Sequence, residues 1–171
     1  MEFNEVIKER YSCKSYDSEK PLEKEKIEKI LEAGRLAPTA KNLQEQHIYV
    51  AYTEEALKKI DECTPCRYGA PVVLVVTYDS NNVFTYPESS TVSGPEDGSI
   101  VATHMMLAAA DEGVNSCWIN NVKRGKLKEL MNIPENEEIV MLLDLGYKKE
   151  GSGPLEKHYL RKELSETVTW L

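Results

Sequence analysis

The sequence predicts an α/β or α+β domain built around a central sheet. Its 171 residues fit one domain and are enough to bury a core. Segments with strand character alternate along the chain with segments of helical periodicity. The unbroken β-branched run in Val72–Tyr78 predicts a strand that is buried on both faces. We therefore expect residues 1–171 to form a single domain.

The first half of the chain gives clear helix signals. Phe3, Val6 and Ile7 have i, i+3, i+4 spacing, and Thr53 has the character of an N-cap residue. Pro21 and Pro38 bracket a further helix. In order, we expect a helix up to about residue 10, an extended or loop segment over 11–18, a helix before Pro38, a polar loop over 39–46, a strand over 47–52, a short helix after Thr53 and a strand over 72–78.

The second half begins with a long polar loop, which in a compact domain is often functional. An Ala- and Met-rich helix follows and is closed by Gly113. In order, we expect the loop over 79–97, the helix over 98–112, a short strand over 116–119, a short helix over 126–131 and a last core strand over 139–145.

The overall charge excludes some classes of partner. The formal net charge is −8, so we expect no nucleic acid or anionic membrane as a partner, and any anionic ligand needs a local basic cluster. The N-terminus lacks the apolar region of a secretory signal, and no apolar run is long enough to span a bilayer. A soluble, cytoplasmic protein with four reduced cysteines is the expectation.

The C-terminal segment 148–171 is the one piece expected to leave the globule. It carries Leu160, Leu164, Val168 and Trp170, which need a surface to cover them. A second subunit could supply that surface, so we expect this arm to pack on the partner in a homodimer.

Three segments carry candidate chemistry. In an extended segment, Arg10, Ser12 and Lys14 point to one side and suit a phosphate, although the two cations could equally cap a helix and stay solvated. Asn42 and Gln44 offer amides that could bind a pyrimidine-like edge, or they could belong to an ordinary polar loop. The strand and turn of 115–121 could present backbone donors to a ligand, or could simply bury Trp118.

The order of these segments resembles the nitroreductase family. Arg10, Ser12 and Lys14 match its Arg-x-Ser-x-Lys/Arg signature, and residues 37–44 match Ala-Pro-Ser/Thr-Ala-x-Asn-x-Gln. Residues 115–120 resemble its Gly-x-x-Ser-x-Trp-Ile-Gly strand, and Leu160-Arg161-Lys162 resembles its basic C-terminal segment. The resemblance implies an α+β, three-layer fold with a mixed, largely antiparallel sheet flanked by helices, in an intertwined dimer.

The resemblance also implies an FMN site. Arg10, Ser12, Lys14 and Arg161 would hold the phosphate and ribityl chain, and Asn42 would contact the flavin. Residues 38–40 would line the ring from the other subunit, and Ile119–Asn120 would lie beside it. The full set of cofactor-binding residues expected is Arg10, Tyr11, Ser12, Lys14, Pro38, Thr39, Ala40, Asn42, Gln44, Trp118, Ile119, Asn120 and Arg161.

The implied activity is hydride transfer from NADH or NADPH, through flavin N5, to a small oxidised acceptor such as a nitroaromatic or a quinone. No side chain is then required as a catalytic acid or base. A flavin reductase, a dehalogenase-like enzyme or a non-catalytic flavin-binding dimer is the alternative. Cys63 and Cys66 form a CxxC motif that closes a helix instead of opening one, which argues against thioredoxin-type chemistry. We expect no metal site, because the three histidines are scattered.

Overall fold

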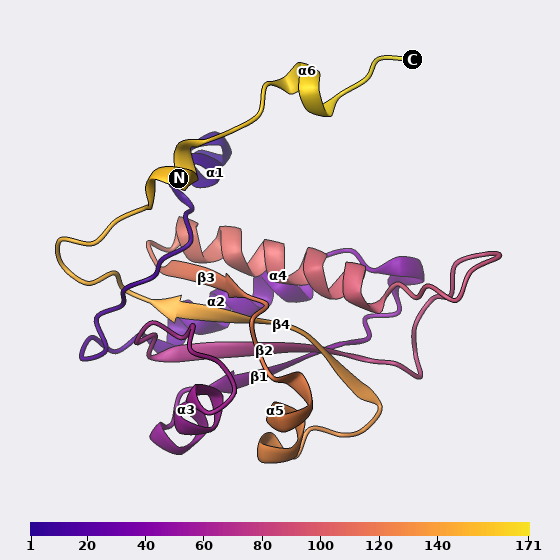
Figure 1. The fold of residues 1–171 in the computed structure, drawn as a ribbon, viewed down its shortest axis with the longest axis horizontal. Helices are drawn as coiled ribbons and strands as arrows, with labels where there is room; N and C mark the ends of the chain where they lie inside the picture. The colour runs from indigo at the N-terminus through magenta and orange to yellow at the C-terminus, as the bar shows by residue number, and fades with distance from the viewer.

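A four-stranded antiparallel sheet forms the middle layer of the molecule (Figure 1). The computed structural model describes residues 1–171. The strand order is β1-β2-β4-β3, and the strands are β1 (Gln46–Ala51), β2 (Val72–Asp79), β3 (Asn115–Ile119) and β4 (Glu137–Gly146). All three pairings between neighbouring strands are antiparallel. The one parallel contact is an isolated bridge between Ser12 and Ser116, which places residues 10–14 along the β3 edge.

Helices cover both faces of this sheet. The helices are α1 (Phe3–Glu9), α2 (Lys24–Arg35), α3 (Glu54–Asp61), α4 (Gly94–Asp111), α5 (Arg124–Met131) and α6 (Leu164–Thr167), with short 3₁₀ helices at Ala40–Asn42 and Glu156–Tyr159. Figure 1 shows α4 and α2 on one face and α3 and α5 on the other. The α+β, three-layer architecture predicted from the resemblance is confirmed.

The two central strands are buried on both faces, as the β-branched run predicts. Residues 72–77 of β2 are all buried, and so are residues 139–146 of β4. Alternate side chains of β2 therefore enter two different core clusters: Val73 packs with α3 and α5, and Leu74 packs with α2 and α4. This double burial fixes the register of the sheet and with it the position of the β3 edge.

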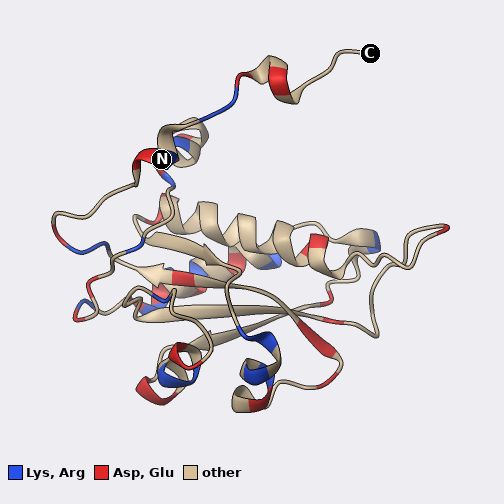
Figure 2. Ribbon diagram, in the orientation of Figure 1, with Lys and Arg blue, Asp and Glu red and all other residues tan.

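Helix α4 begins earlier than expected. The sequence interpretation extended the polar loop to residue 97, whereas the helix starts at Gly94 and the loop covers only 80–93. Pro95 lies in the first turn, where a helix needs no N–H donor, so the proline starts the helix instead of belonging to the loop. Figure 2 shows that α4 carries charged residues only near its ends, as expected for a helix packed on a core.

The C-terminal segment leaves the globule, as expected. Figure 1 shows α6 and the C-terminus extending away from the three layers. Leu160, Leu164 and Trp170 are exposed. None of the helices has the length and apolar character required to cross a bilayer.

Candidate functional site

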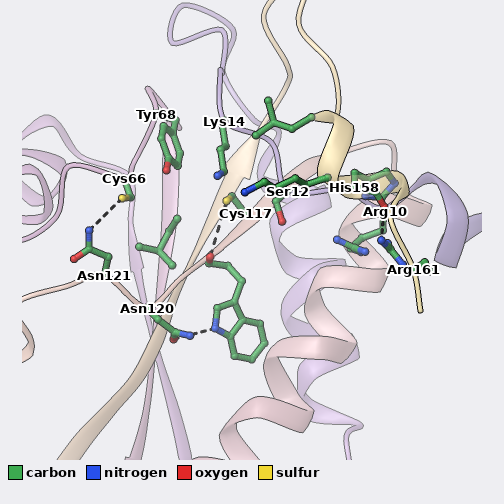
Figure 3. Close-up of a pocket in the computed structure, with 14 residues that line it drawn as sticks. Arg10, Ser12, Lys14, Cys66, Tyr68, Cys117, Asn120, Asn121, His158 and Arg161 are labelled. Atoms are coloured by element: carbon green, nitrogen blue, oxygen red, sulfur yellow. Dashed lines mark hydrogen bonds between the residues drawn. The ribbon is translucent and has the colours of Figure 1, made fainter. Parts of the chain in front are cut away.

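A cavity of about 510 Å³ lies between the β3 edge, residues 10–14 and the start of the C-terminal arm (Figure 3). This volume falls within the range typical of small-molecule sites. The lining residues come from four separate parts of the chain: residues 10–14, the loop after α3, the end of β3 with its following turn, and residues 155–161. Tertiary pairing therefore creates the site, chiefly through the hydrogen bond from the Cys13 N–H to the Ser116 carbonyl, at 2.9 Å.

Alternation along residues 10–14 selects which side chains reach the cavity. Arg10, Ser12 and Lys14 line it, whereas Tyr11 and Cys13 are buried in the core on the other side. The segment is extended and bridged to β3, so successive side chains must point in opposite directions. The prediction that the three polar side chains share one side is confirmed.

Positive charge concentrates at one end of the cavity. Arg10, Arg161 and His158 lie together there, and Lys157 also lines the cavity, whereas no carboxylate does. None of the lysines or arginines of this cavity takes part in a salt bridge. Burial and the charge of Arg161 lower the pKa of Arg10. In a chain of net charge −8, these unpaired cations make this end suited to an anion.

Arg161 is held by its own backbone. Its guanidinium donates to the carbonyl oxygens of His158 and Leu160, the latter at 2.7 Å. These bonds orient the side chain without neutralising its charge, because both acceptors are uncharged. The arm therefore brings a cation to the cavity that is free to bind an external anion.

The opposite end of the cavity is polar, carries no lysine or arginine, and includes one thiol. The Trp118 indole N–H donates to Asn120 Oδ1 at 3.0 Å, and Asn121 Nδ2 lies 3.7 Å from Cys66 Sγ. Hydrogen bonding by Tyr68 is the main reason why the pKa of the Cys66 thiol is lowered. In Figure 3 this group lies across the cavity from Arg10 and Arg161, with Lys14 and Cys117 between the two ends. An elongated ligand with an anionic end and a flat polar end would match this arrangement.

The predicted site residues fall into three groups. The cavity brings together Arg10, Ser12, Lys14, Trp118, Ile119, Asn120 and Arg161. The side chain of Tyr11 packs in the core instead of lining the cavity, and its ring meets the edge of His158. Pro38, Thr39, Ala40, Asn42 and Gln44 lie in a separate loop between α2 and β1, so one subunit alone does not unite them with the cavity.

Sequence reasoning missed several lining residues. Cys66, Tyr68 and Asn121 form the uncharged end, and Lys157 and His158 also line the cavity. The CxxC motif singles out Cys66, but for thioredoxin-type chemistry. Asn121 directly follows Asn120, which the sequence does predict in the site. The basic character of residues 157–162 could have extended the prediction from Arg161 to Lys157.

Comparisons with known proteins agree with this architecture. Residues 7–64 and 65–147 match the model of the Nitroreductase family. A protein of Archaeoglobus fulgidus, provisionally named NADH dehydrogenase/NAD(P)H nitroreductase, is 34% identical over 152 residues, which cover 85% of this chain and 84% of that relative. The crystal structure of a nitroreductase family protein from Clostridium difficile 630 superposes with a TM-score of 0.91 at 36% identity, covering 99% of this chain and 98% of that one.

A second structure is of interest for its ligand. The nitroreductase with bound FMN from Bacteroides fragilis NCTC 9343 has a TM-score of 0.77 at 24% identity, with 100% of this chain and 99% of that chain covered. At that identity the likeness shows a shared fold. Together the fold and these relatives define an oxidoreductase of the α+β class. The chain belongs to the nitroreductase family.

Proposed function

We propose that this chain is an FMN-dependent oxidoreductase that works as a homodimer. When bound, FMN would supply hydride transfer, accepting a hydride from NADH or NADPH at N5 and passing it to a small oxidised acceptor such as a nitroaromatic or a quinone. The phosphate would be held by Arg10, Ser12 and Arg161, and Lys14 would lie nearer the ring.

The observation that carries the proposal is the unpaired positive charge of the cavity. Two guanidiniums and two lysines without carboxylate partners repel one another unless an anion joins them. The fork of an arginine matches a phosphate, and a hydrogen bond to a charged group contributes about 1.5–3 kcal/mol. A dianionic phosphate monoester at this end fits the donor set.

The residues at the other end suit a flat heterocycle. Ile119 offers an apolar surface, and the amides of Asn120 and Asn121 offer donors and acceptors. These groups bind and orient, and none of them is placed to act as a catalytic base. The protein's contribution to the reaction would be positioning, exclusion of water and a positive local charge.

The homodimer accounts for the residues that lie outside the cavity. Pro38, Asn42 and Gln44 are exposed on their loop, so they are accessible to a second subunit. The exposed apolar residues of the arm need a partner surface of the same kind. In the proposed dimer this loop would complete the partner's cofactor site.

The first experiment is a visible spectrum of the purified protein, recorded with added FMN and then with anaerobic NADPH. We expect a bound flavin band that bleaches on reduction. Arg10→Ala should weaken FMN binding about tenfold to a hundredfold, because it removes hydrogen bonds between charged groups. Arg161→Ala should act in the same direction.

Lys24→Ala is the matched control, because Lys24 is an exposed cation on α2 that pairs with Glu28, away from the cavity. Its FMN affinity should equal that of the wild type. Unchanged affinity in Arg10→Ala would remove the phosphate assignment. A protein that binds FMN but does not bleach would be a flavin-binding protein with no NADPH-linked activity.

A further inference from the structure

Two buried carboxyl groups face each other where the loop after α2 meets the start of α4. Glu45 is 5% exposed and Asp97 is 4% exposed, and Ser93 contacts both residues. Its hydroxyl lies 3.3 Å from Glu45 Oε1, and its backbone carbonyl accepts the Asp97 N–H at 2.8 Å. The buried atoms Glu45 Oε2 and Asp97 Oδ2 have no hydrogen-bond partner. Two acceptor-only carboxylates cannot bond to each other, so one proton between them satisfies both buried oxygens.

The two carboxyl groups have different surroundings. Asp97 lies in the first turn of α4, and its Oδ1 accepts the Ala40 N–H at 2.9 Å, which ties this carboxyl group to loop 39–44. Neither carboxyl forms a salt bridge. Burial is the main cause that raises the pKa of Glu45, and the neighbouring Asp97 carboxyl group adds to it. Glu45 therefore stays protonated to a higher pH than is usual for a glutamate.

The pair joins two loops to the helix. Asp97 holds the Ala40 amide, and the Ser93 hydroxyl lies 3.3 Å from Glu45 Oε1. Ser93 Oγ also accepts the Phe84 N–H at 3.2 Å, which ties in loop 80–93. The carboxyl pair is thus the common attachment point of loop 39–44 and loop 80–93.

The loop that the pair holds has a strained backbone. Lys41, Asn42 and Gln44 have φ values of 52°, 56° and 53°, in the left-handed region that residues other than glycine seldom adopt. Such conformations persist only where the surroundings impose them. The part-buried hydrogen bond at Ala40 is the anchor directly before this strained stretch.

We propose that Glu45 and Asp97 share one proton and thereby hold loop 39–44 in the conformation that presents Asn42 and Gln44 to the partner's cofactor. They are positioning residues, because neither lines the cavity. The effect on the cofactor rests on the proposed function, whereas the sharing of the proton and the hold on the loop do not.

The neighbouring charges leave the pair without a counter-ion. Glu96 bonds the Tyr86 hydroxyl on the outer side of α4, and Lys41 lies over the Phe84 ring, 4.7 Å from its centroid. The backbone N–H of Asp79, at the end of β2, donates to the backbone carbonyl of Glu45, so this contact does not involve either carboxyl group. Once the shared proton is lost, the two carboxylates repel each other with no cation between them. The loop should therefore loosen as the pH rises through the raised pKa of Glu45.

Hydrogen exchange of the peptide containing Ala40, followed by mass spectrometry on the full chain with and without FMN, tests the proposal. Between about pH 5 and about pH 9, the range into which burial moves a glutamate, we expect protection corrected for intrinsic exchange to fall about tenfold or more. Glu45→Gln can donate a hydrogen bond to Asp97 but cannot ionise, so its protection should not depend on pH.

Glu96→Gln is the matched control, because it removes the neighbouring acid of the same helix turn and leaves the pair intact. Its protection should fall as in the wild type. Asp97→Asn is a second variant, which should also abolish the pH dependence because it can donate to Glu45. Constant protection in the wild type, or a fall in Glu45→Gln equal to that in the wild type, would overturn the proposal.

The same samples separate the two proposals. If protection behaves as expected while FMN affinity does not follow it, the proton-sharing pair stands and the loop's role at the cofactor fails. If the protein binds no FMN at all, the proposed function fails and the exchange result still decides the fate of the pair.

Discussion

The thiol of Cys66 differs from the other three cysteine thiols in both exposure and acidity. Cys13, Cys63 and Cys117 are buried, and burial raises the pKa of each, that of Cys117 to about 12. Cys66 is half-buried at the cavity wall, and hydrogen bonding by Tyr68 lowers the pKa of its thiol. Thiolate is the reactive form, so the difference in pKa becomes a difference in nucleophilicity.

We therefore expect iodoacetamide to modify a single cysteine at neutral pH, and peptide mapping should identify it as Cys66. Cys66→Ser should abolish this fast phase, whereas Cys63→Ser, the other half of the CxxC motif, should leave it unchanged. Bound FMN should slow the reaction because Cys66 lines the cavity. Inorganic phosphate, which we expect to occupy only the cationic end, should not protect Cys66 from the reagent. Equal labelling of several cysteines would contradict the prediction.

Asp144 is a second residue in an unusual state. It is fully buried on β4, and neither of its carboxyl oxygens has a hydrogen-bond partner. Arg67 is the nearest opposing charge, but its guanidinium is bonded to Asp61 and to the carbonyl of Ala70. Burial consequently raises the pKa of Asp144 to about 9, so the group is neutral in the native protein.

This state gives stability a definite pH dependence. An unfolded aspartate ionises near pH 4, so between about pH 4 and about pH 9 the native state binds more protons than the unfolded state. The free energy of unfolding should then fall as the pH rises across that range. Asp144→Asn removes the titrating group, and its stability should vary less with pH. Guanidinium denaturation at about pH 5 and about pH 8 measures both slopes, and parallel slopes would refute the assignment.

At the scale of whole elements, hydrophobic periodicity and the residues that start or end helices predict the secondary structure correctly where tertiary packing agrees with them. Thr53 caps α3 by accepting the Ala56 N–H, and the β-branched run forms the doubly buried β2. The sequence predicts the start of α4 too late, because the polar composition of residues 79–97 favours a loop whereas Pro95 lies in the first helical turn. Pro95, which follows Ser93 and Gly94, is compatible with either a loop or a first helical turn, and tertiary packing decides between them.

The site was predictable only within each segment. Alternation placed Arg10, Ser12 and Lys14 on one side, because that rule needs no tertiary information. Cys66 and Tyr68 reach the same cavity from the loop after α3, and long-range pairings bring these parts together, namely the bridge of Ser12 with Ser116 and the bond from the Tyr16 N–H to the Tyr68 carbonyl. Local sequence carries no signal for such a pairing, so those lining residues could not be identified in advance.

Two glycines in helices provide a test of how α4 is seated. A Cβ at Gly94 would lie 2.2 Å from the ring of Tyr78 on β2, whereas a Cβ at Gly125 in α5 would meet nothing within 4 Å. Gly94→Ala should therefore lower the free energy of unfolding by about 1–3 kcal/mol through overpacking. Gly125→Ala should raise it by about 0.5–1 kcal/mol, because alanine costs less entropy in a helix. Thermal denaturation of both variants checks the pair, and a neutral Gly94→Ala would contradict the close contact.

At the scale of the whole molecule, the C-terminal arm leaves a large amount of apolar surface uncovered. Leu160 is 72% exposed, Leu164 is 70% exposed and Trp170 is 90% exposed. Monomers seldom expose contiguous apolar surface of this kind, and a stable interface typically buries about 800 Å² on each partner. The arm also carries Arg161, so the segment that would hold the dimer together also supplies part of the cavity.

The dual role of the arm can be separated by two sets of variants. Replacing Leu160, Leu164 and Trp170 by serine removes the apolar contacts and keeps Arg161, so we expect a dimer-to-monomer shift in sedimentation equilibrium, by at least about tenfold in dissociation constant. FMN affinity should fall with it, because the loop that carries Asn42 and Gln44 would no longer reach a second cavity. Arg161→Ala should instead leave the dimer intact and weaken FMN binding alone. A serine variant that is monomeric yet binds FMN as tightly as the wild type would show that one subunit suffices, and would limit the arm's contribution to the guanidinium of Arg161.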